Sequence, residues 1–202
     1  MGSPTPVSTL HPLEVLVVSL GALWLPIVLS AVLVFITSSL IHMVLKYHAS
    51  DYTLLPNEDA VRAAIRAGNP QPRQYIIPYC KEMKELESPE MKQKFQEGPV
   101  AVLNIKPSGQ TSMGKPLVQW FLFSLVVSFF IAYVAAHTVA PGTPYLEVFR
   151  VVGTIGFLAY AAGQLPAAIW MGKPWSVAWK EVFDGLVYGS MTAGTFGWLW
   201  PR

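Results

Sequence analysis

The stretch Leu117–His137, LVQWFLFSLVVSFFIAYVAAH, decides the class of fold that this chain can adopt. It contains no Asp, Glu, Lys or Arg, and Lys115 and Pro116 precede it. A membrane span needs about 20 apolar residues, because a helix rises 1.5 Å per residue and the hydrocarbon core is about 30 Å thick. Backbone groups in lipid must satisfy one another, so such a stretch is expected to be helical. We therefore predict a transmembrane helix at about 117–137.

Three further stretches meet the same criterion. The first runs from Leu13 to Leu45 and is too long for one straight span. Either the helix kinks near Pro26, or residues 13–25 lie at the interface and Pro26 begins the span. The remaining two are expected at 145–171, with a kink at a proline, and at 176–200. The fold class predicted is an all-α integral membrane protein with four transmembrane helices, the first of them within residues 1–47 and the other three within 116–202.

The composition of the whole chain agrees with this class. Of 202 residues, 52% are hydrophobic and only 13% are charged, whereas soluble proteins carry about 25% charged residues. The net charge of +2 is too small to favour nucleic acid as a partner, which needs a clustered basic face. The first apolar run lacks a positively charged leader, so we expect it to be retained and not cleaved as a signal peptide.

One polar region, residues 48–115, separates the first two spans and is expected to form a small mixed α/β insert. Residues 57–68 begin with Asn and two acids and end with Gly, which predicts a helix. Residues 88–98 begin with Ser-Pro and end with Gly, which predicts a second helix. Residues 74–77 and 100–105 are typical of strands. A region of this size forms a marginal core alone, so it should lean on the bundle or on a partner.

The basic residues predict the orientation of the chain in the membrane. With four spans, the insert and the loop near Lys173 lie on one side, and positive loops favour the cytoplasm. We expect a bacterial inner membrane, with the insert cytoplasmic and both termini outside. Twelve basic residues lie on the predicted inner side (Lys46, Arg62, Arg66, Arg73, Lys81, Lys84, Lys92, Lys94, Lys106, Lys115, Lys173, Lys180), and two on the outer side (Arg150, Arg202).

Residues 109–115 match the spacing G-x-x-x-x-G-K of a phosphate-binding loop. The next position is Pro116, which lacks the hydroxyl that would hold magnesium. Met-Gly-Lys-Pro also recurs at 171–174, again before a span. Gly ends a segment, Lys reaches the headgroups and Pro starts a helix, so membrane entry explains the motif and we expect no nucleotide.

The last apolar stretch begins with Lys180, Glu181 and Asp184, which is unusual for a span. If its helix starts near Ser176, Asp184 lies about 12 Å along it, near the edge of the hydrocarbon core. Residues of matching depth on the other spans predict a polar intramembrane layer. Such a layer either joins helices through buried hydrogen bonds or handles a proton or substrate. Its predicted members are His42, Ser124, Gln164 and Asp184.

Small residues repeat at every fourth position of the same stretch, and they let helix backbones approach closely. This helix-packing face is expected either to pack inside the bundle or to mediate self-association or docking onto a larger assembly. Its members are Gly185, Gly189, Ala193 and Gly197.

The histidines predict no metal or haem site, because a site between spans needs two of them at matched depth on facing helices, and only one histidine lies inside each relevant span. His42 and His48 belong near one membrane face, and His11 and His137 near the other. The lone cysteine, Cys80, excludes an intrachain disulfide, and with Met83 it is typical of packing.

No catalytic residues are predicted, and no cofactor. We therefore expect a non-enzymatic accessory, scaffold or assembly component of a membrane complex, with the lipid bilayer and a protein as its partners. The alternative is a small proton-coupled transporter or membrane enzyme that uses His42 and Asp184.

Overall fold

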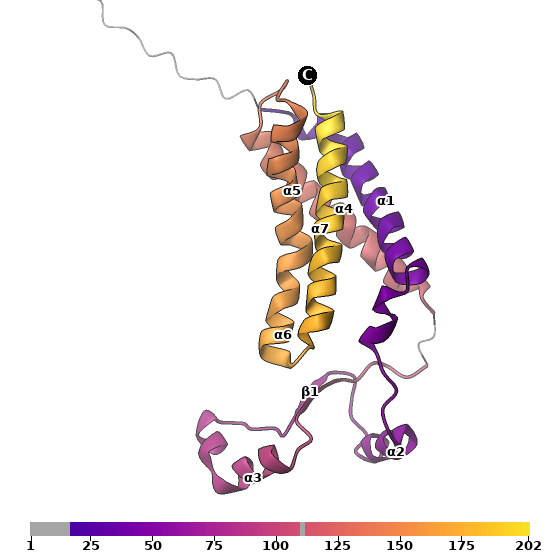
Figure 1. The fold of residues 1–202 in the computed structure, drawn as a ribbon, viewed down its shortest axis with the longest axis vertical. Helices are drawn as coiled ribbons and strands as arrows, with labels where there is room; N and C mark the ends of the chain where they lie inside the picture. The colour runs from indigo at the N-terminus through magenta and orange to yellow at the C-terminus, as the bar shows by residue number, and fades with distance from the viewer. Residues whose placement is uncertain (1–16, 110–111) are drawn as a thin grey trace, which may run out of the picture.

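The computed structural model describes residues 17–109 and 112–202, which are mostly helical with one two-stranded sheet. Residues 13–16 of the first predicted span, His11 and two positions of the 109–115 motif lie outside the described residues. The long helices α1, α4, α5 and α7 form an upright bundle, and the polar insert lies beyond one end of it (Figure 1). The C-terminus lies at the opposite end.

Three helical segments are long and apolar enough to cross a membrane: Leu20–Val44, Gly114–Thr138 and Tyr145–Met171. The first is built from η1 (Leu20–Leu23), α1 (Trp24–Ser39) and the π-helical turn η2 (Leu40–Val44). The second is α4 (Gly114–Thr138). The third consists of α5 (Tyr145–Ala161), η5 (Ala162–Gln164) and α6 (Leu165–Met171).

Both prolines of these segments lie in the first turn of a helix. Pro26 is in the first turn of α1, where its missing N–H would have no partner in any case. Pro166 is in the first turn of α6, directly after the 3₁₀ turn η5. Because proline cannot donate to the carbonyl four residues earlier, the regular hydrogen-bond pattern is interrupted there. The long third segment is therefore divided next to its proline.

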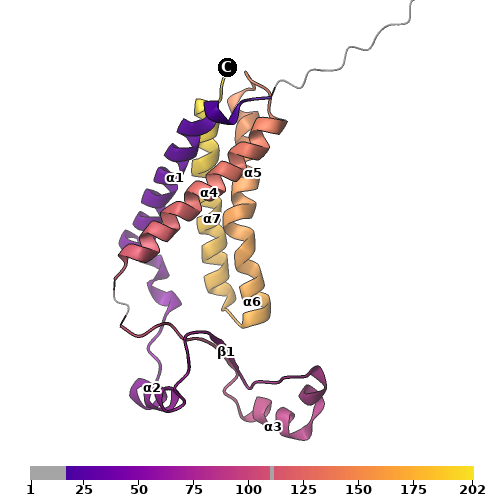
Figure 2. The same cartoon turned by 180° about the vertical axis from the view of Figure 1, so that it is seen from behind.

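The fourth long helix, α7 (Trp175–Leu199), has 25 residues, as many as α4, but is not among the three apolar segments. It runs alongside α5 in both views (Figures 1 and 2). Its buried face includes Gly185, Gly189, Thr192 and Ala193. Small and weakly polar residues reduce the apolar content of a helix while they allow close packing, so a central helix is less hydrophobic than its neighbours.

The small-residue face of α7 packs against α5 of the same chain. A Cβ added at Gly185 would lie 2.7 Å from the Cβ of Ala161, and one at Gly189 would lie 2.8 Å from the backbone N of Phe157. A Cβ at Gly197 would lie 2.8 Å from the ring of Tyr145. Ala193 is fully buried. A partner molecule cannot occupy this face while α5 covers it.

Helix α4 crosses the other helices obliquely (Figure 2) and is joined to α1 by side-chain hydrogen bonds. The hydroxyls of Ser30 and Ser128 lie 3.0 Å apart, and both residues are fully buried. Nearer the insert, the indole Nε1 of Trp120 donates to the Ser38 hydroxyl over 2.8 Å. Polar contacts of this kind hold helices together where the hydrophobic effect is weak.

A double-mutant cycle of Ser30→Ala and Ser128→Ala is expected to give a coupling energy of about 0.6 kcal/mol, the usual value for hydrogen bonds between membrane helices. The hydroxyl of Ser30 also donates to the Pro26 carbonyl over 2.6 Å, so losing Ser128 leaves it satisfied. Unfolding of the purified protein in mixed detergent micelles measures all four free energies. A coupling energy of zero would contradict the contact.

The insert contains two helices and two strands at the positions that the sequence predicts, together with two short turns of 3₁₀ helix. The strands pair antiparallel, from Gln74 opposite Asn104 to Ile77 opposite Ala101. The Ser88 hydroxyl accepts a hydrogen bond from the Met91 N–H and caps its helix. Asn57 makes no such bond, so its expected side-chain cap is wrong. The elements are η3 (Tyr47–Asp51), α2 (Glu58–Ala67), β1 (Gln74–Ile77), η4 (Met83–Glu87), α3 (Pro89–Glu97) and β2 (Ala101–Asn104).

The insert buries almost nothing of its own. Between residues 52 and 109, all of them described, Met91 is the only buried side chain. Helix α2 has no buried residue, although its apolar and polar residues fall on opposite faces. The hydrophobic core of the molecule therefore lies in the helical bundle.

Candidate functional site

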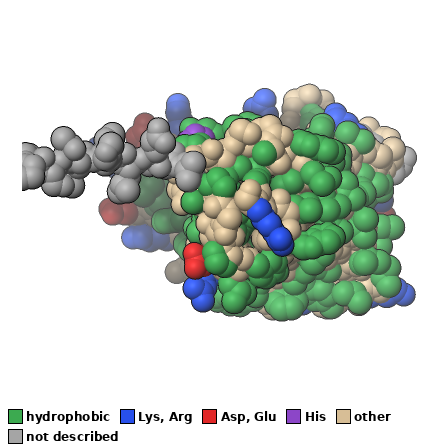
Figure 3. All heavy atoms as spheres, turned by 90° about the horizontal axis from the view of Figure 1, so that it is seen from above, with side chains coloured by type: hydrophobic (Ala, Val, Ile, Leu, Met, Phe, Trp, Pro, Cys, Tyr) green, Lys and Arg blue, Asp and Glu red, His purple; other side chains and the backbone are tan. Residues whose placement is uncertain are grey.

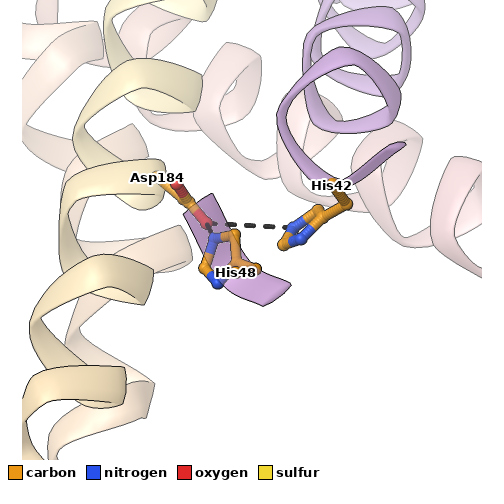
Figure 4. A group of neighbouring side chains, drawn as sticks. All are labelled: His42, His48 and Asp184. Carbon is orange, nitrogen blue, oxygen red and sulfur yellow. Dashed lines mark hydrogen bonds and ion pairs between the residues drawn. The ribbon is translucent and has the colours of Figure 1, made fainter. Parts of the chain in front are cut away.

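A cluster of ionisable side chains surrounds Asp184 where the bundle meets the insert. Asp184 lies on α7 and is only 3% exposed. Its Oδ2 atom is 2.8 Å from His48 Nε2 and 3.8 Å from His42 Nε2 (Figure 4). The Tyr47 hydroxyl donates a hydrogen bond to the other carboxylate oxygen, Oδ1. One carboxylate on α7 is thus met by three side chains from the end of the first span.

The backbone after the first span brings these side chains to α7. The π-helical turn η2 carries His42, and the chain then reverses at Lys46, whose φ of 53° is left-handed. The 3₁₀ turn η3 follows and carries Tyr47, His48 and Asp51. A left-handed residue ends a helix and turns the chain back, so η3 lies against α7 and does not continue away from it.

A second carboxylate, Asp51, holds the far side of the His48 ring. Its Oδ2 atom is 2.5 Å from His48 Nδ1, and its Oδ1 accepts a hydrogen bond of 2.5 Å from Lys180 Nζ. Lys180 also donates to the Tyr47 carbonyl over 2.7 Å and to the Ser50 hydroxyl over 2.9 Å. An ammonium group has three donors, and all three of this lysine are used. Lys180, at the charged start of α7, therefore holds the turn η3 in place through these three hydrogen bonds.

The charge state of Asp51 follows from its neighbours. Its removal from water acts to raise its pKa, but the hydrogen bonds and positive charges of Lys180 and His48 act in the opposite direction and prevail. The pKa of Asp51 therefore lies below its ordinary value of 3.8, and the group is an anion at neutral pH. His48 lies between this anion and the carboxylate of Asp184, and it can donate to both only as an imidazolium ion.

The cluster opens to the outside through a cavity of about 270 Å³. His42, His48, Asp51 and Glu181 are among the residues that line it. The side chain of His42 is 49% exposed, whereas that of Asp184 is buried behind it. Glu181 forms an ion pair with Lys173 at the rim. Small ions and water can thus reach the imidazole of His42 from outside.

Three aromatic side chains, Tyr188, Tyr160 and Trp120, pack together on the side of the cluster that faces the interior of the bundle. Tyr188 lies one turn beyond Asp184 on α7, and its ring centroid is 5.7 Å from that of Tyr160 and 6.0 Å from that of Trp120. Tyr160 and Tyr188 are both buried. The charged cluster is therefore confined to the insert end of the bundle.

The structure brings together two of the four residues expected in the polar layer, His42 and Asp184. Ser124 is buried on α4, where its hydroxyl donates to the Trp120 carbonyl over 3.0 Å. Gln164 is half-buried in η5. Within the described residues, neither forms a hydrogen bond with Asp184.

Sequence reasoning missed the role of η3, and it assigned His48 to the insert. Tyr47, His48, Asp51 and Lys180 all belong to the observed cluster. A usable signal was present, because the segment Tyr-His-Ala-Ser-Asp follows the first span at the depth where Lys180 and Asp184 begin the last one. His137 lies at the other end of the bundle on α4, with its Nδ1 atom 2.6 Å from the Tyr133 carbonyl.

Comparison of this chain with models of protein families, with curated proteins and with solved structures found no match. The class of the protein therefore follows from the fold alone. Three helices of sufficient length and apolarity indicate a multi-pass membrane protein.

Proposed function

We propose that this protein is a non-enzymatic accessory or assembly component of a membrane complex, and that its insert docks onto a protein partner. One observation carries the proposal: between residues 52 and 109 the insert has regular helices and strands but buries only Met91. A domain of this size needs a core, disulfides or a bound partner to be stable, and a chain with one cysteine forms no internal disulfide.

The exposed residues of the insert favour a protein over a lipid or nucleic acid surface. Tyr52, Leu54 and Met83 are 89%, 82% and 81% exposed. Burial of such side chains against a partner is worth about 25 cal/mol for each Å². Residues 48–114 carry eight acids and eight basic residues, so the insert offers no net charge to a phosphate backbone or to anionic headgroups.

We place α7 in the membrane as the fourth span. Its 25 residues extend over about 37 Å, enough to cross the hydrocarbon core, and it lies beside α5 for most of its length (Figure 1). The end of the bundle with the C-terminus shows mainly hydrophobic and uncharged side chains (Figure 3). Most basic residues lie at the insert end, which supports a cytoplasmic insert and external termini.

Two of the buried hydroxyls agree with a packing role. Ser124 donates to the Trp120 carbonyl and Thr192 to the Tyr188 carbonyl, each within its own helix. Bonds of this kind satisfy a hydroxyl locally and are common in membrane helices that only pack together.

The proposal is tested with the variant Leu54→Glu/Met83→Glu, purified from native membranes in mild detergent beside the wild-type chain. We expect the wild-type protein to elute with a stoichiometric partner, and the variant to elute alone. The bundle of the variant should be as stable as that of the wild type when both are unfolded in mixed detergent micelles. Glu adds charge where the partner would bury apolar surface, which costs several kcal/mol.

The matched control is Gln96→Glu/Ser108→Glu, which adds the same charge at exposed polar positions of the insert. It should keep the partner. A wild-type chain that elutes alone, or a control that loses the partner equally, would overturn the docking proposal.

A further inference from the structure

We infer that His42, His48 and Asp184 form a binding site for a divalent transition-metal ion at the cytoplasmic end of the bundle. The proposed docking role does not depend on this site. Nothing in the spacing of the sequence predicts it, because His42 and His48 are separated by the reversal of the chain at Lys46.

The ligand atoms are already close to a coordination geometry. One nitrogen from each histidine and one oxygen of Asp184 all lie within 4.8 Å of one another. Two of these separations, 2.8 Å for His48 and 3.8 Å for His42 from Asp184 Oδ2, bracket the distance of about 3.3 Å between ligands of a tetrahedral zinc ion. Figure 4 shows both rings next to the carboxylate. Each of these two distances differs from the tetrahedral value by about 0.5 Å, so both histidines lie near the position that a shared ion would require.

The neighbours of the ligands are those that a metal site requires. A metal-binding histidine usually donates its second N–H to a carboxylate, which fixes the ring and leaves the other nitrogen for the ion. Asp51 takes this position at His48 Nδ1, and Lys180 in turn holds Asp51. The Tyr47 hydroxyl orients Asp184 through Oδ1, which leaves Oδ2 for the ion.

The ring of His42 is also available to an ion. Its side chain is 49% exposed, and it forms no hydrogen bond among the described residues. A metal ion at this place would give the ring a bonding partner.

The type and number of ligands define the ion. Two imidazoles and one carboxylate suit Zn²⁺ and its first-row neighbours, whereas Mg²⁺ and Ca²⁺ prefer oxygen ligands only. Three protein ligands leave a fourth position, and both histidines line the cavity of about 270 Å³. A site of this form holds water or a small ligand at the open position.

The test is a Zn²⁺ titration of the purified full-length protein in detergent, followed by competition with a zinc-sensitive dye. We expect one ion per chain, no displacement by millimolar Mg²⁺, and at least tenfold weaker binding in His42→Ala. His42 forms no hydrogen bond among the described residues, so this variant should unfold like the wild type. Substitution of Co²⁺ should give the visible absorption of a four-coordinate ion.

Two further variants sharpen the result. His137→Ala removes an exposed histidine at the opposite end of the bundle and should bind Zn²⁺ like the wild type. Asp51→Asn keeps all three ligands but weakens the hold on His48, so binding should fall about 10-fold. Equal affinities in the wild type and His42→Ala, or a stoichiometry well below one ion per chain, would overturn the inference.

Discussion

Replacing Gly189 by valine is expected to destabilise the protein by about 3 kcal/mol or more, or to prevent folding altogether. The first atom that a new side chain meets is the backbone N of Phe157, 2.8 Å from the added Cβ, followed by the backbone C of Gly156 at 3.1 Å. Backbone atoms cannot rotate away as a flexible side chain can. Helices α5 and α7 would therefore have to separate, which would open the core along both of them.

Gly194→Ala is the matched control for this prediction. It lies on the same helix, but an added Cβ would be 3.5 Å from the Tyr145 hydroxyl, an ordinary contact. Alanine also favours a helix over glycine by up to about 1 kcal/mol, so stability should be unchanged or slightly higher. Unfolding in mixed micelles, measured by circular dichroism, compares the two. A Gly189→Val variant as stable as the wild type would show that α5 and α7 do not pack as described.

Replacing Asp184 by alanine is expected to cost about 3–5 kcal/mol, the range found when one partner of a buried ion pair is removed. The change leaves His48 Nε2 and the Tyr47 hydroxyl without their acceptor in a buried place. The turn η3 should then be held to α7 more weakly, through the hydrogen bonds of Lys180 alone. Amide hydrogen exchange of residues 47–51 should become much faster, and the unfolding free energy should fall.

Glu181→Ala removes the same charge from the same helix, one turn away. Its carboxylate is paired with Lys173, and its side chain is 27% exposed. Ion pairs in contact with water contribute about 1 kcal/mol or less, so this variant should leave exchange at residues 47–51 unchanged. If the two variants behaved alike, the cluster around Asp184 would not be what fixes η3.

Local sequence signals predicted most of the secondary structure. Ser88-Pro89 begins α3, and the uncharged run at 117–137 lies within α4. The two strands also form within the short segments, 74–77 and 100–105, that the sequence predicts as strands. These signals depend on a few neighbouring residues, which is why they can be interpreted without a tertiary structure.

The candidate site needed information that spacing does not contain. Depth counting relates His42 to Asp184, but it gives only height along a helix and not direction around it. Ser124 and Gln164 have suitable heights, yet among the described residues neither forms a hydrogen bond with Asp184. The reversal at Lys46 depends on a left-handed backbone that lysine rarely adopts, and this reversal brings Tyr47 and His48 to α7.

The position of η3 in the chain has a mechanical consequence. It is the only backbone link between α1 and the insert, and its side chains are fixed to α7 by Asp184 and Lys180. The start of the insert is therefore coupled to α7, a helix more than a hundred residues later, as well as to α1. If the insert binds a partner as proposed, these contacts would couple movement of that partner to α7.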